Sequence, residues 1–264
     1  MQRRQFLAAS LATSALALTR DLSAQSAGTQ PREFYQIRRY QLHSGPQTKL
    51  TESYFADALI PALARLGMGP VGAFRLEYGP VSPAYYLVIP GPAVETLVTV
   101  DLHLAEDRDF MKAAEPFWNA PATEPAFDRV ESWLLEAFAG WPKITPPPAT
   151  ATKGKRIFQL RTYESPSYRD HVRKVEMFHA GEFGFFQKAG FNPVFFGDTL
   201  IGSRMPCLTY MLGLNELAEL EPKWAAFSGD PDWKKLSADP HFAFEPTVSD
   251  ISNLILSPLS MSQV

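Results

Sequence analysis

The strongest constraint on the fold is an internal repeat that runs through most of the chain. A strand-like segment ends at Tyr40 and a similar one ends at Tyr163, and the amphipathic segments that follow end at Gly67 and Gly190. Both pairs of residues are separated by 123 positions (163 − 40 and 190 − 67). A constant spacing of this length indicates duplication of a whole domain, because solenoid repeats have periods of only about 20 to 50 residues. We therefore expect two copies of one fold in a single chain.

Each copy contains the same order of hydrophobic patterns. Alternating apolar and polar residues predict strands, and apolar residues at three- and four-residue steps predict helices. In the first copy these patterns predict strands at 34–42, 70–78, 84–89 and 129–138, and helices at 48–66 and 93–114. In the second copy they predict strands at 156–164, 193–201, 207–213 and 247–256, and helices at 170–189, 214–227 and 232–238. The resulting order, β-α-β-β-α-β, is that of a ferredoxin-like unit.

A single unit of this kind leaves one face of its sheet uncovered, because its helices pack on the other face. The second copy can cover that face by packing its antiparallel sheet face to face against the first, with the helices outside. We therefore predict an α+β fold in which two tandem ferredoxin-like units form an intrachain pseudo-dimer around a barrel-like core. The predicted domains span 34–140 and 156–258, and a Pro-rich linker at 141–155 joins them. Association beyond the pseudo-dimer stays open.

The first residues predict export. Arg3 and Arg4 precede a mildly apolar, Ala-rich run that ends at Leu18, and small residues follow. This pattern is typical of a twin-arginine signal peptide. The apolar run of about 13 residues is shorter than the roughly 20 residues that span a bilayer. We expect cleavage to remove residues 1–27, leaving a linker at 28–33, a mature chain without a membrane span, and a periplasmic or extracellular location.

Composition argues against several classes of function. The formal net charge is −3 and no basic cluster follows a helix face, so we expect no nucleic-acid partner. Cys207 is the one cysteine, which rules out an intramolecular disulfide and agrees with folding in a reducing compartment before export. Its apolar surroundings in the sequence favour a small core residue over a nucleophile. The histidines lack metal-ligand spacing and no nucleotide-binding motif is present, so the sequence implies no metal and no cofactor.

Three motifs resemble those of the NIPSNAP family: Phe158–Tyr163, Lys188–Val194 and Trp224–Trp233. Domains of that family adopt the dimeric α/β-barrel fold, so the resemblance implies this fold for both halves, arranged here as an intrachain barrel. It implies no catalytic residues, since none is established for the family. The wider barrel superfamily includes cofactor-independent monooxygenases, haem-degrading enzymes and small-molecule-binding proteins, which is an analogy at the level of the fold. The first half departs from the second at Arg39, where the second has Thr162.

Comparison of the two copies identifies two polar residues in an apolar helix stripe. His179 and Glu182 occupy the positions of Ala56 and Leu59 in the first copy. They are three residues apart on a predicted helix, so their side chains can meet. The pair could serve as a general base and its orienting carboxylate. The alternative is that both lie at the edge of the stripe and satisfy each other or a backbone group.

A second set of candidates lies on the first strand of each copy. Arg38 and Tyr40 share one face, as do Arg161 and Tyr163, and we expect this polar face to look into the space between the two sheets. An Arg beside a Tyr there could bind an anionic or phenolic ligand. We also expect Tyr210 to form part of a core or pocket wall. The alternative is a structural network in which each Arg pairs with an acidic residue of a neighbouring strand and holds the halves in register.

Three functions remain open at this stage. The first is binding of a small hydrophobic or aromatic molecule in a pocket walled by one sheet and its helices. The second is a cofactor-independent monooxygenase or isomerase that uses His179, Glu182, Arg161 and Tyr163. The third is a structural or protein-interaction module without a small-molecule site. An enclosed cavity that touches His179 and Glu182 would favour the enzyme, an enclosed apolar cavity without them would favour binding, and a filled core would favour interaction.

Overall fold

The structure is a computed structural model that describes residues 31–43, 45–242 and 244–264. Residues from Arg32 to Val264 form one compact unit. The predicted signal peptide and residues 28–30 of the predicted linker lie outside the described residues. Within the described part of the chain, every helix is too short or too polar to cross a membrane.

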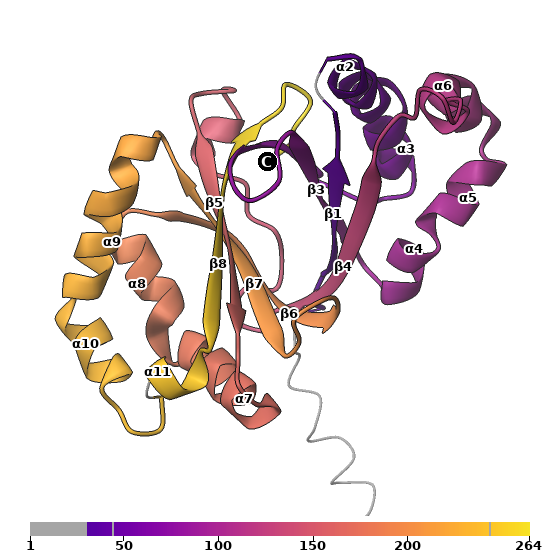
Figure 1. The fold of residues 1–264 in the computed structure, drawn as a ribbon. Helices are drawn as coiled ribbons and strands as arrows, with labels where there is room; N and C mark the ends of the chain where they lie inside the picture. Colours follow the sequence, from indigo (N-terminus) through magenta and orange to yellow (C-terminus); the bar gives the residue numbers. More distant parts are fainter. Residues whose placement is uncertain (1–30, 44, 243) are drawn as a thin grey trace, which may run out of the picture. The chain divides into compact units, whose positions relative to one another are not determined.

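Eight strands of the described residues close into a barrel with the order β1-β3-β2-β8-β5-β7-β6-β4 (Figure 1). All neighbouring strands are antiparallel. The halves join where β2 pairs with β8 and where β4 pairs with β6, so the predicted barrel-like core is a continuous ring of strands. The strands are β1 Phe34–Gln41, β2 Gly72–Tyr78, β3 Ala84–Gly91, β4 Arg129–Ala137, β5 Ile157–Glu164, β6 Asn192–Ile201, β7 Cys207–Leu214 and β8 Asp250–Pro258.

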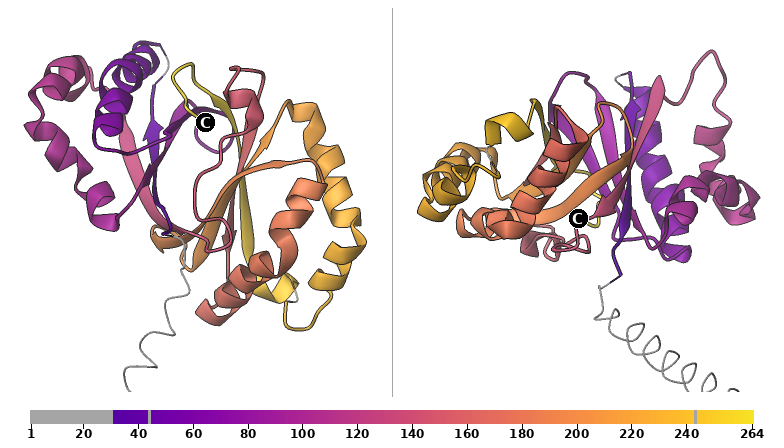
Figure 2. Two further views of the ribbon diagram at one scale, coloured as in Figure 1. Left: turned by 180° about the vertical axis from the view of Figure 1, so that it is seen from behind. Right: turned by 90° about the horizontal axis from the view of Figure 1, so that it is seen from below.

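The helices pack outside the barrel on two opposite sides, one set for each half (Figure 2). Those of the first half are α2 Pro46–Ser53, the π-helical η1 Tyr54–Leu59, α3 Ile60–Arg65, α4 Val94–Val98, α5 Val100–Glu106 and α6 Arg108–Trp118. Those of the second half are α7 Tyr168–Met177, the π-helical η3 Phe178–Glu182, α8 Phe183–Lys188, the short η4 Leu217–Glu219, α9 Leu220–Gly229, α10 Pro231–Ser237 and α11 Phe244–Thr247. The linker contains one short turn, η2 Pro148–Thr150. The predicted β-α-β-β-α-β order is confirmed in both halves.

Local sequence signals explain where the long helices begin and end. Gly67 and Gly190 both have positive φ angles, 73° and 87°, which glycine adopts without steric cost. Ser167 caps α7 by accepting a hydrogen bond from the backbone N–H of Asp170. Asp230 caps α10 in the same way, as its position before Pro231 predicts.

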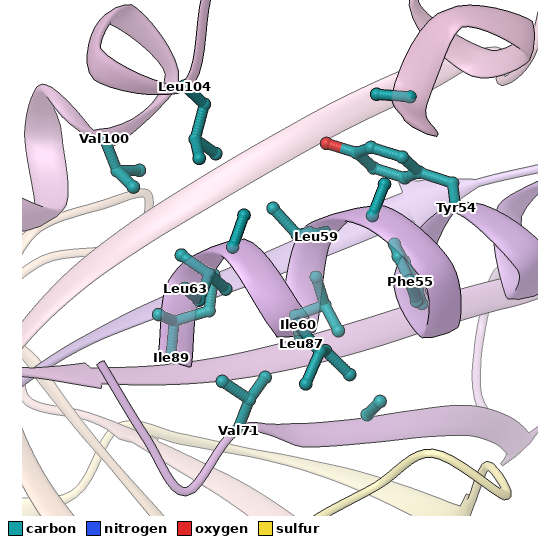
Figure 3. Close-up of a cluster of buried hydrophobic side chains, with 14 of the residues drawn as sticks. Tyr54, Phe55, Leu59, Ile60, Leu63, Val71, Leu87, Ile89, Val100 and Leu104 are labelled. Atoms are coloured by element: carbon teal, nitrogen blue, oxygen red, sulfur yellow. The ribbon is translucent and has the colours of Figure 1, made fainter. Parts of the chain in front are cut away.

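The buried apolar residues form three clusters. One lies between the first-half helices and their strands, and Figure 3 shows its central residues, among them Phe55, Leu63 and Leu87. A second is its counterpart in the other half, rich in phenylalanine. The third fills the barrel interior at the end where β1 and β5 begin, and Ile144 of the linker and Val264 close that end. The barrel is therefore packed at one end by side chains from both halves.

The predicted orientation of the first strands is wrong. Tyr40 belongs to the cluster under the first-half helices, and Arg38 bonds to Asp101 of α5, so this face points outward from the barrel. The opposite face, with Tyr35 and Ile37, points into the barrel interior. Both faces of these strands are covered, one by helices and one by the far side of the barrel. The alternation of residues therefore identifies the side chains that share a face. It does not show whether that face packs against the helices or points into the barrel.

Candidate functional site

A cavity of about 400 Å³ occupies the end of the barrel opposite the packed end. It lies where β1 and β5 finish, between the hairpin that joins β2 to β3 and the hairpin that joins β6 to β7. Pro80 comes from the first hairpin, and Ser203 and Arg204 come from the second. Because the inner faces of strands from both halves line it, the cavity exists only when the barrel is closed.

One part of the cavity wall is apolar. Ile37 and Leu160, which occupy equivalent positions in the two copies, face the cavity together with Trp133 and Leu254 from the paired strands β4 and β8. Tyr86 also lines it, and burial raises the pKa of its hydroxyl. These side chains offer flat and aliphatic surfaces of the kind that hold the apolar body of a small ligand.

The first half supplies a charged wall. Arg39 forms an ion pair with Glu131 on the neighbouring strand β4. The Arg39 guanidinium also lies 5.9 Å from the centroid of the Trp133 ring, within the range of a cation–π contact. Both ionic groups are partly exposed, with 19% and 34% of their side chains accessible, so the pair faces the cavity and is not sealed in the core.

The second half supplies hydroxyl groups at the matching positions. Thr162 stands where the first half has Arg39, and its Oγ1 lies 2.9 Å from Oγ1 of Thr209. Ser252 pairs with Thr162 across the strands, as Glu131 pairs with Arg39. The strands of the first half therefore contribute an ion pair to the cavity and those of the second half contribute hydroxyl groups, so a ligand would meet different chemistry from each half.

The hairpin between β6 and β7 forms part of the rim. Nη1 of Arg204 donates to Oε1 of Glu164 at 3.2 Å and to Oγ of Ser252 at 3.1 Å. The Trp133 indole N–H donates to Oγ of Ser203 at 3.3 Å. Arg204 has a φ angle of 63°, a left-handed conformation that a residue with a Cβ adopts at a cost. The hydrogen bonds therefore hold this hairpin against the strands of both halves.

Cys207 also lines the cavity, at the start of β7. Its side chain is buried, and burial raises the pKa of the thiol above its usual range. A protonated thiol is a weak nucleophile and a weak metal ligand. The prediction that Cys207 is a small buried residue is confirmed by its 2% exposure.

The structure does not bring the predicted catalytic pair together. His179 is exposed, and its ring bonds to backbone on both sides: Nδ1 lies 2.8 Å from the Val175 carbonyl and Nε2 accepts the Gly140 N–H at 3.1 Å. Glu182 points into the core, where its Oε2 lies 2.7 Å from Nζ of Lys174. Gly181, with φ of 155°, breaks the regular helix between the two residues. Neither lines the barrel cavity.

The predicted ligand-binding residues of the first half lie under the helices, on the outer side of the barrel. Nη1 of Arg38 donates to Oδ1 of Asp101 at 2.9 Å, and the Arg38 side chain is only 6% exposed. Tyr40 packs edge-on against Phe55 of the first-half helix η1. The alternative interpretation placed the acidic partner of Arg38 on a neighbouring strand, whereas the partner in the structure, Asp101, lies on α5.

The predicted residues of the second half do come together. Tyr210 donates from its hydroxyl to that of Tyr163 at 2.7 Å, and Nη2 of Arg161 donates to the same oxygen at 3.1 Å. The Arg161 guanidinium lies 4.2 Å from the Trp224 ring centroid. Burial raises the pKa of both tyrosines. These residues form a packed polar cluster beneath α9, outside the barrel cavity, and their role in ligand binding stays a prediction.

Sequence reasoning missed the residues that line the cavity, above all Arg39, Trp133 and Arg204. One signal was present. The two copies differ at Arg39 and Thr162, on the strand face opposite the one that was predicted to look into the space between the sheets. Glu131 and Ser252, which pair with Arg39 and Thr162 across the strands, differ in the same way. These positions, where a charged residue in one copy is replaced by a neutral polar residue in the other, face the cavity.

Within the described residues, no group of three or more His, Cys, Asp or Glu side chains is placed to hold a metal ion. The ionic groups of the barrel cavity are two arginines and one glutamate. The cavity therefore has an apolar surface with hydrogen-bonding and ionic groups around it, which is suited to binding a ligand.

Comparisons with known proteins bear on the family and the fold. Residues 158–263 match the model of the NIPSNAP family, and no curated protein matches the chain. A candidate monooxygenase from Fusobacterium nucleatum has a TM-score of 0.56 at 7% identity, over 87% of this chain and 93% of its own. One from Lactobacillus acidophilus has a TM-score of 0.54 at 9% identity, over 86% of this chain and 94% of its own. At these identities the likeness concerns the fold alone.

A NIPSNAP family protein from Agrobacterium tumefaciens is also similar. It is 17% identical to this chain with a TM-score of 0.37, over 46% of this chain and 96% of its own length.

Proposed function

This chain carries a NIPSNAP-family domain at residues 158–263, and from that premise we propose that it binds a small hydrophobic or aromatic molecule in the cavity at the end of its barrel. The observation that carries the proposal is the cavity of about 400 Å³ lined by Trp133, Tyr86, Leu160 and Leu254. Its volume falls within the range of small-molecule sites, which combine apolar walls with a few placed polar groups.

The packed end of the barrel supports this location. Side chains from both halves, with Ile144 and Val264, fill the interior at the end where β1 and β5 begin. The interior at the other end remains hollow although apolar side chains are available around it. A cavity that the core does not fill costs stability, so its retention favours a binding role over a purely structural one.

The enzyme alternative is not supported by the residues that suggested it. His179 is exposed and bonds to backbone, and Glu182 is paired with Lys174. Neither these two residues nor Arg161 and Tyr163 line the cavity. The fold neighbours described as candidate monooxygenases share the barrel at identities of 7% and 9%, which is no argument about chemistry.

The test is titration of the protein with cinnamyl alcohol, a neutral aromatic probe, by isothermal calorimetry. We expect binding to the wild type. Thr162→Phe should abolish it, because a ring at this position fills the cavity. Val130→Phe is the matched control, since Val130 lies on the outer face of β4 and is 36% exposed. Absence of binding to the wild type, or equal binding by the two variants, would refute the proposal.

We also propose, from residues 1–27 alone, that the protein is exported through the twin-arginine route. Replacement of Arg3 and Arg4 by lysine should leave the full-length protein inside the cell. Export of that variant at the wild-type level would contradict this proposal. N-terminal sequencing of the exported wild-type protein would give the cleavage position.

A further inference from the structure

The rim of the barrel cavity has an excess of hydrogen-bond donors. Ser203 Oγ accepts the Trp133 indole N–H, and Ser252 Oγ accepts an N–H from Arg204. Because each hydroxyl oxygen is already held by a fixed donor, the hydroxyl proton of each serine is left to donate elsewhere. Both residues line the cavity.

Arg204 adds to this set. Its two hydrogen bonds, to Glu164 and Ser252, both use Nη1. Among the described residues, Nε and Nη2 of Arg204 have no hydrogen-bond partner. The side chain is 60% exposed, so these groups are reachable from solvent. The edge formed by Nε and Nη2 is the one that binds a carboxylate through two parallel hydrogen bonds.

The nearby acidic groups are both engaged. Glu131 is paired with Arg39, and Glu164 is paired with Arg204. The Arg39 guanidinium, whose Nε is buried, adds a second positive charge to the wall. The polar groups that a ligand meets therefore offer donors, while the carboxylates that could repel an anion already have cationic partners.

The backbone conformation of Arg204 indicates that the surrounding contacts hold this residue in one position. Its φ angle of 63° is disfavoured for a residue with a Cβ, and such strain is retained where the surrounding contacts over-determine it. Here those contacts come from β5, β8 and, through Ser203, from β4 of the other half. The result is a guanidinium held beside an apolar cavity that contains an indole ring.

We infer that the ligand of this cavity is an aromatic carboxylate, with its ring against Trp133 and Leu160 and its carboxylate on Nε and Nη2 of Arg204 and the hydroxyls of Ser203 and Ser252. This inference rests on the proposed binding function and adds the chemical class of the ligand. Arg204 favours binding of this carboxylate. The negative charge of Glu164, which accepts from Nη1 of Arg204, opposes it.

The test compares two probes that differ in one group, cinnamate and cinnamyl alcohol, by calorimetry. The wild type should bind cinnamate roughly tenfold more tightly than the alcohol, as expected for charge-assisted hydrogen bonds at a partly exposed site. Arg204→Gln should lower the affinity for cinnamate more than the affinity for the alcohol, and so remove that preference. Glu164→Gln should strengthen cinnamate binding, because it removes a negative charge beside the bound carboxylate.

Arg75→Gln is the matched control. Arg75 is 56% exposed and paired with Glu77 on the same barrel, but it does not line the cavity. This variant should keep the wild-type preference for cinnamate. Thermal unfolding followed by circular dichroism checks that each variant is folded.

The outcomes separate the two proposals. If neither probe binds the wild type, the binding function fails and the ligand class fails with it. If the alcohol binds and cinnamate has no advantage, the function stands and the inference is wrong. It is also wrong if Arg204→Gln retains the preference for cinnamate, or if Arg75→Gln loses it to the same extent.

Discussion

Nζ of Lys174 lies 2.7 Å from Oε2 of Glu182, and the two side chains are 0% and 1% exposed. The ammonium also lies 4.8 Å from the centroid of the Phe178 ring. Burial lowers the pKa of Lys174 and raises that of Glu182, and each charge opposes the shift of the other. In the first copy the position of Glu182 is taken by Leu59, so this ion pair belongs to the second copy alone.

We expect Lys174→Met to destabilise the protein by about 3–5 kcal/mol, because it leaves the buried carboxylate of Glu182 without its cationic partner. The double variant with Glu182→Leu should recover most of that loss, since both buried charges are then absent. Urea denaturation measures the free energy of unfolding. Lys188→Met is the control. Lys188 is 59% exposed, whereas its partner Asp230 is 8% exposed, so we expect a loss of no more than about 1 kcal/mol. A double variant no more stable than the single one would contradict this account.

Gly181 provides a second prediction. Its φ of 155° is unfavourable for other residues, and a Cβ there would lie 3.3 Å from Cζ of Phe185. Gly181→Ala should therefore destabilise the protein by about 1–3 kcal/mol. Gly184 is the matched control: it lies in α8 and a Cβ there would meet nothing within 4 Å. Gly184→Ala should stabilise by roughly 0.5–1 kcal/mol. Equal effects of the two substitutions in thermal unfolding would show that the break in the helix carries no conformational cost.

Substitution of His179 distinguishes a catalytic role of this residue from a structural one. His179→Ala removes the acceptor of the Gly140 N–H and a donor to the Val175 carbonyl, which should cost about 1 kcal/mol of stability. We expect cinnamyl alcohol to bind this variant with unchanged affinity, because His179 does not line the cavity. Calorimetry and urea denaturation on the same preparation give both values. A loss of affinity at unchanged stability would restore His179 as a site residue.

The pKa of Glu219 is lowered to about 2 from its ordinary 4.5, first because Lys223 donates to its carboxylate and then because Asn215 does. A carboxyl group with a lowered pKa in the folded state stabilises the fold above its unfolded pKa, and this contribution is lost as the pH falls. The stability advantage of the wild type over Glu219→Gln should therefore shrink between about pH 4.5 and about pH 2.

The control for that measurement is Glu221→Gln. Glu221 is in the first turn of α9 and has no hydrogen bond or ion pair with any described residue. Because Glu221 lacks such partners, Glu221→Gln should change the free energy of unfolding at pH 7 less than Glu219→Gln does. If the Glu219→Gln difference does not change between about pH 4.5 and about pH 2, the contacts of Glu219 with Lys223 and Asn215 do not stabilise the folded state.

Much of the fold was predictable because the signals for it are local and occur twice. The helix stripe that ends at Gly67 and the one that ends at Gly190 each set the length of a helix, and the glycines set its end. The strands and their order followed from the alternation of residues. That the two copies enclose one core was predictable because the helices of each copy cover only one face of its sheet, and the other apolar face must also be buried.

The candidate site was not predictable to the same degree. His179 and Glu182 are three residues apart, which on a regular helix places side chains on one face. The helix is not regular there, since η3 is π-helical and Gly181 departs from helical geometry, so one side chain reaches the surface and the other the core. The partner of Glu182, Lys174, lies on the same predicted helix. The sequence does not indicate that this lysine is buried, because a lysine in an amphipathic helix is normally solvated.

By itself, the sequence determined the duplication, the β-α-β-β-α-β order of each copy and the residues that share a strand face. Only the tertiary structure decided which face of β1 and β5 points inward, and with it that Arg39 and Thr162, not Arg38 and Arg161, reach the cavity. The physical reason is that both faces of these strands are buried. Alternation of apolar and polar residues distinguishes a strand face in the core from a face in water. It does not distinguish two buried faces, and here helices cover one face while the opposite wall of the barrel covers the other.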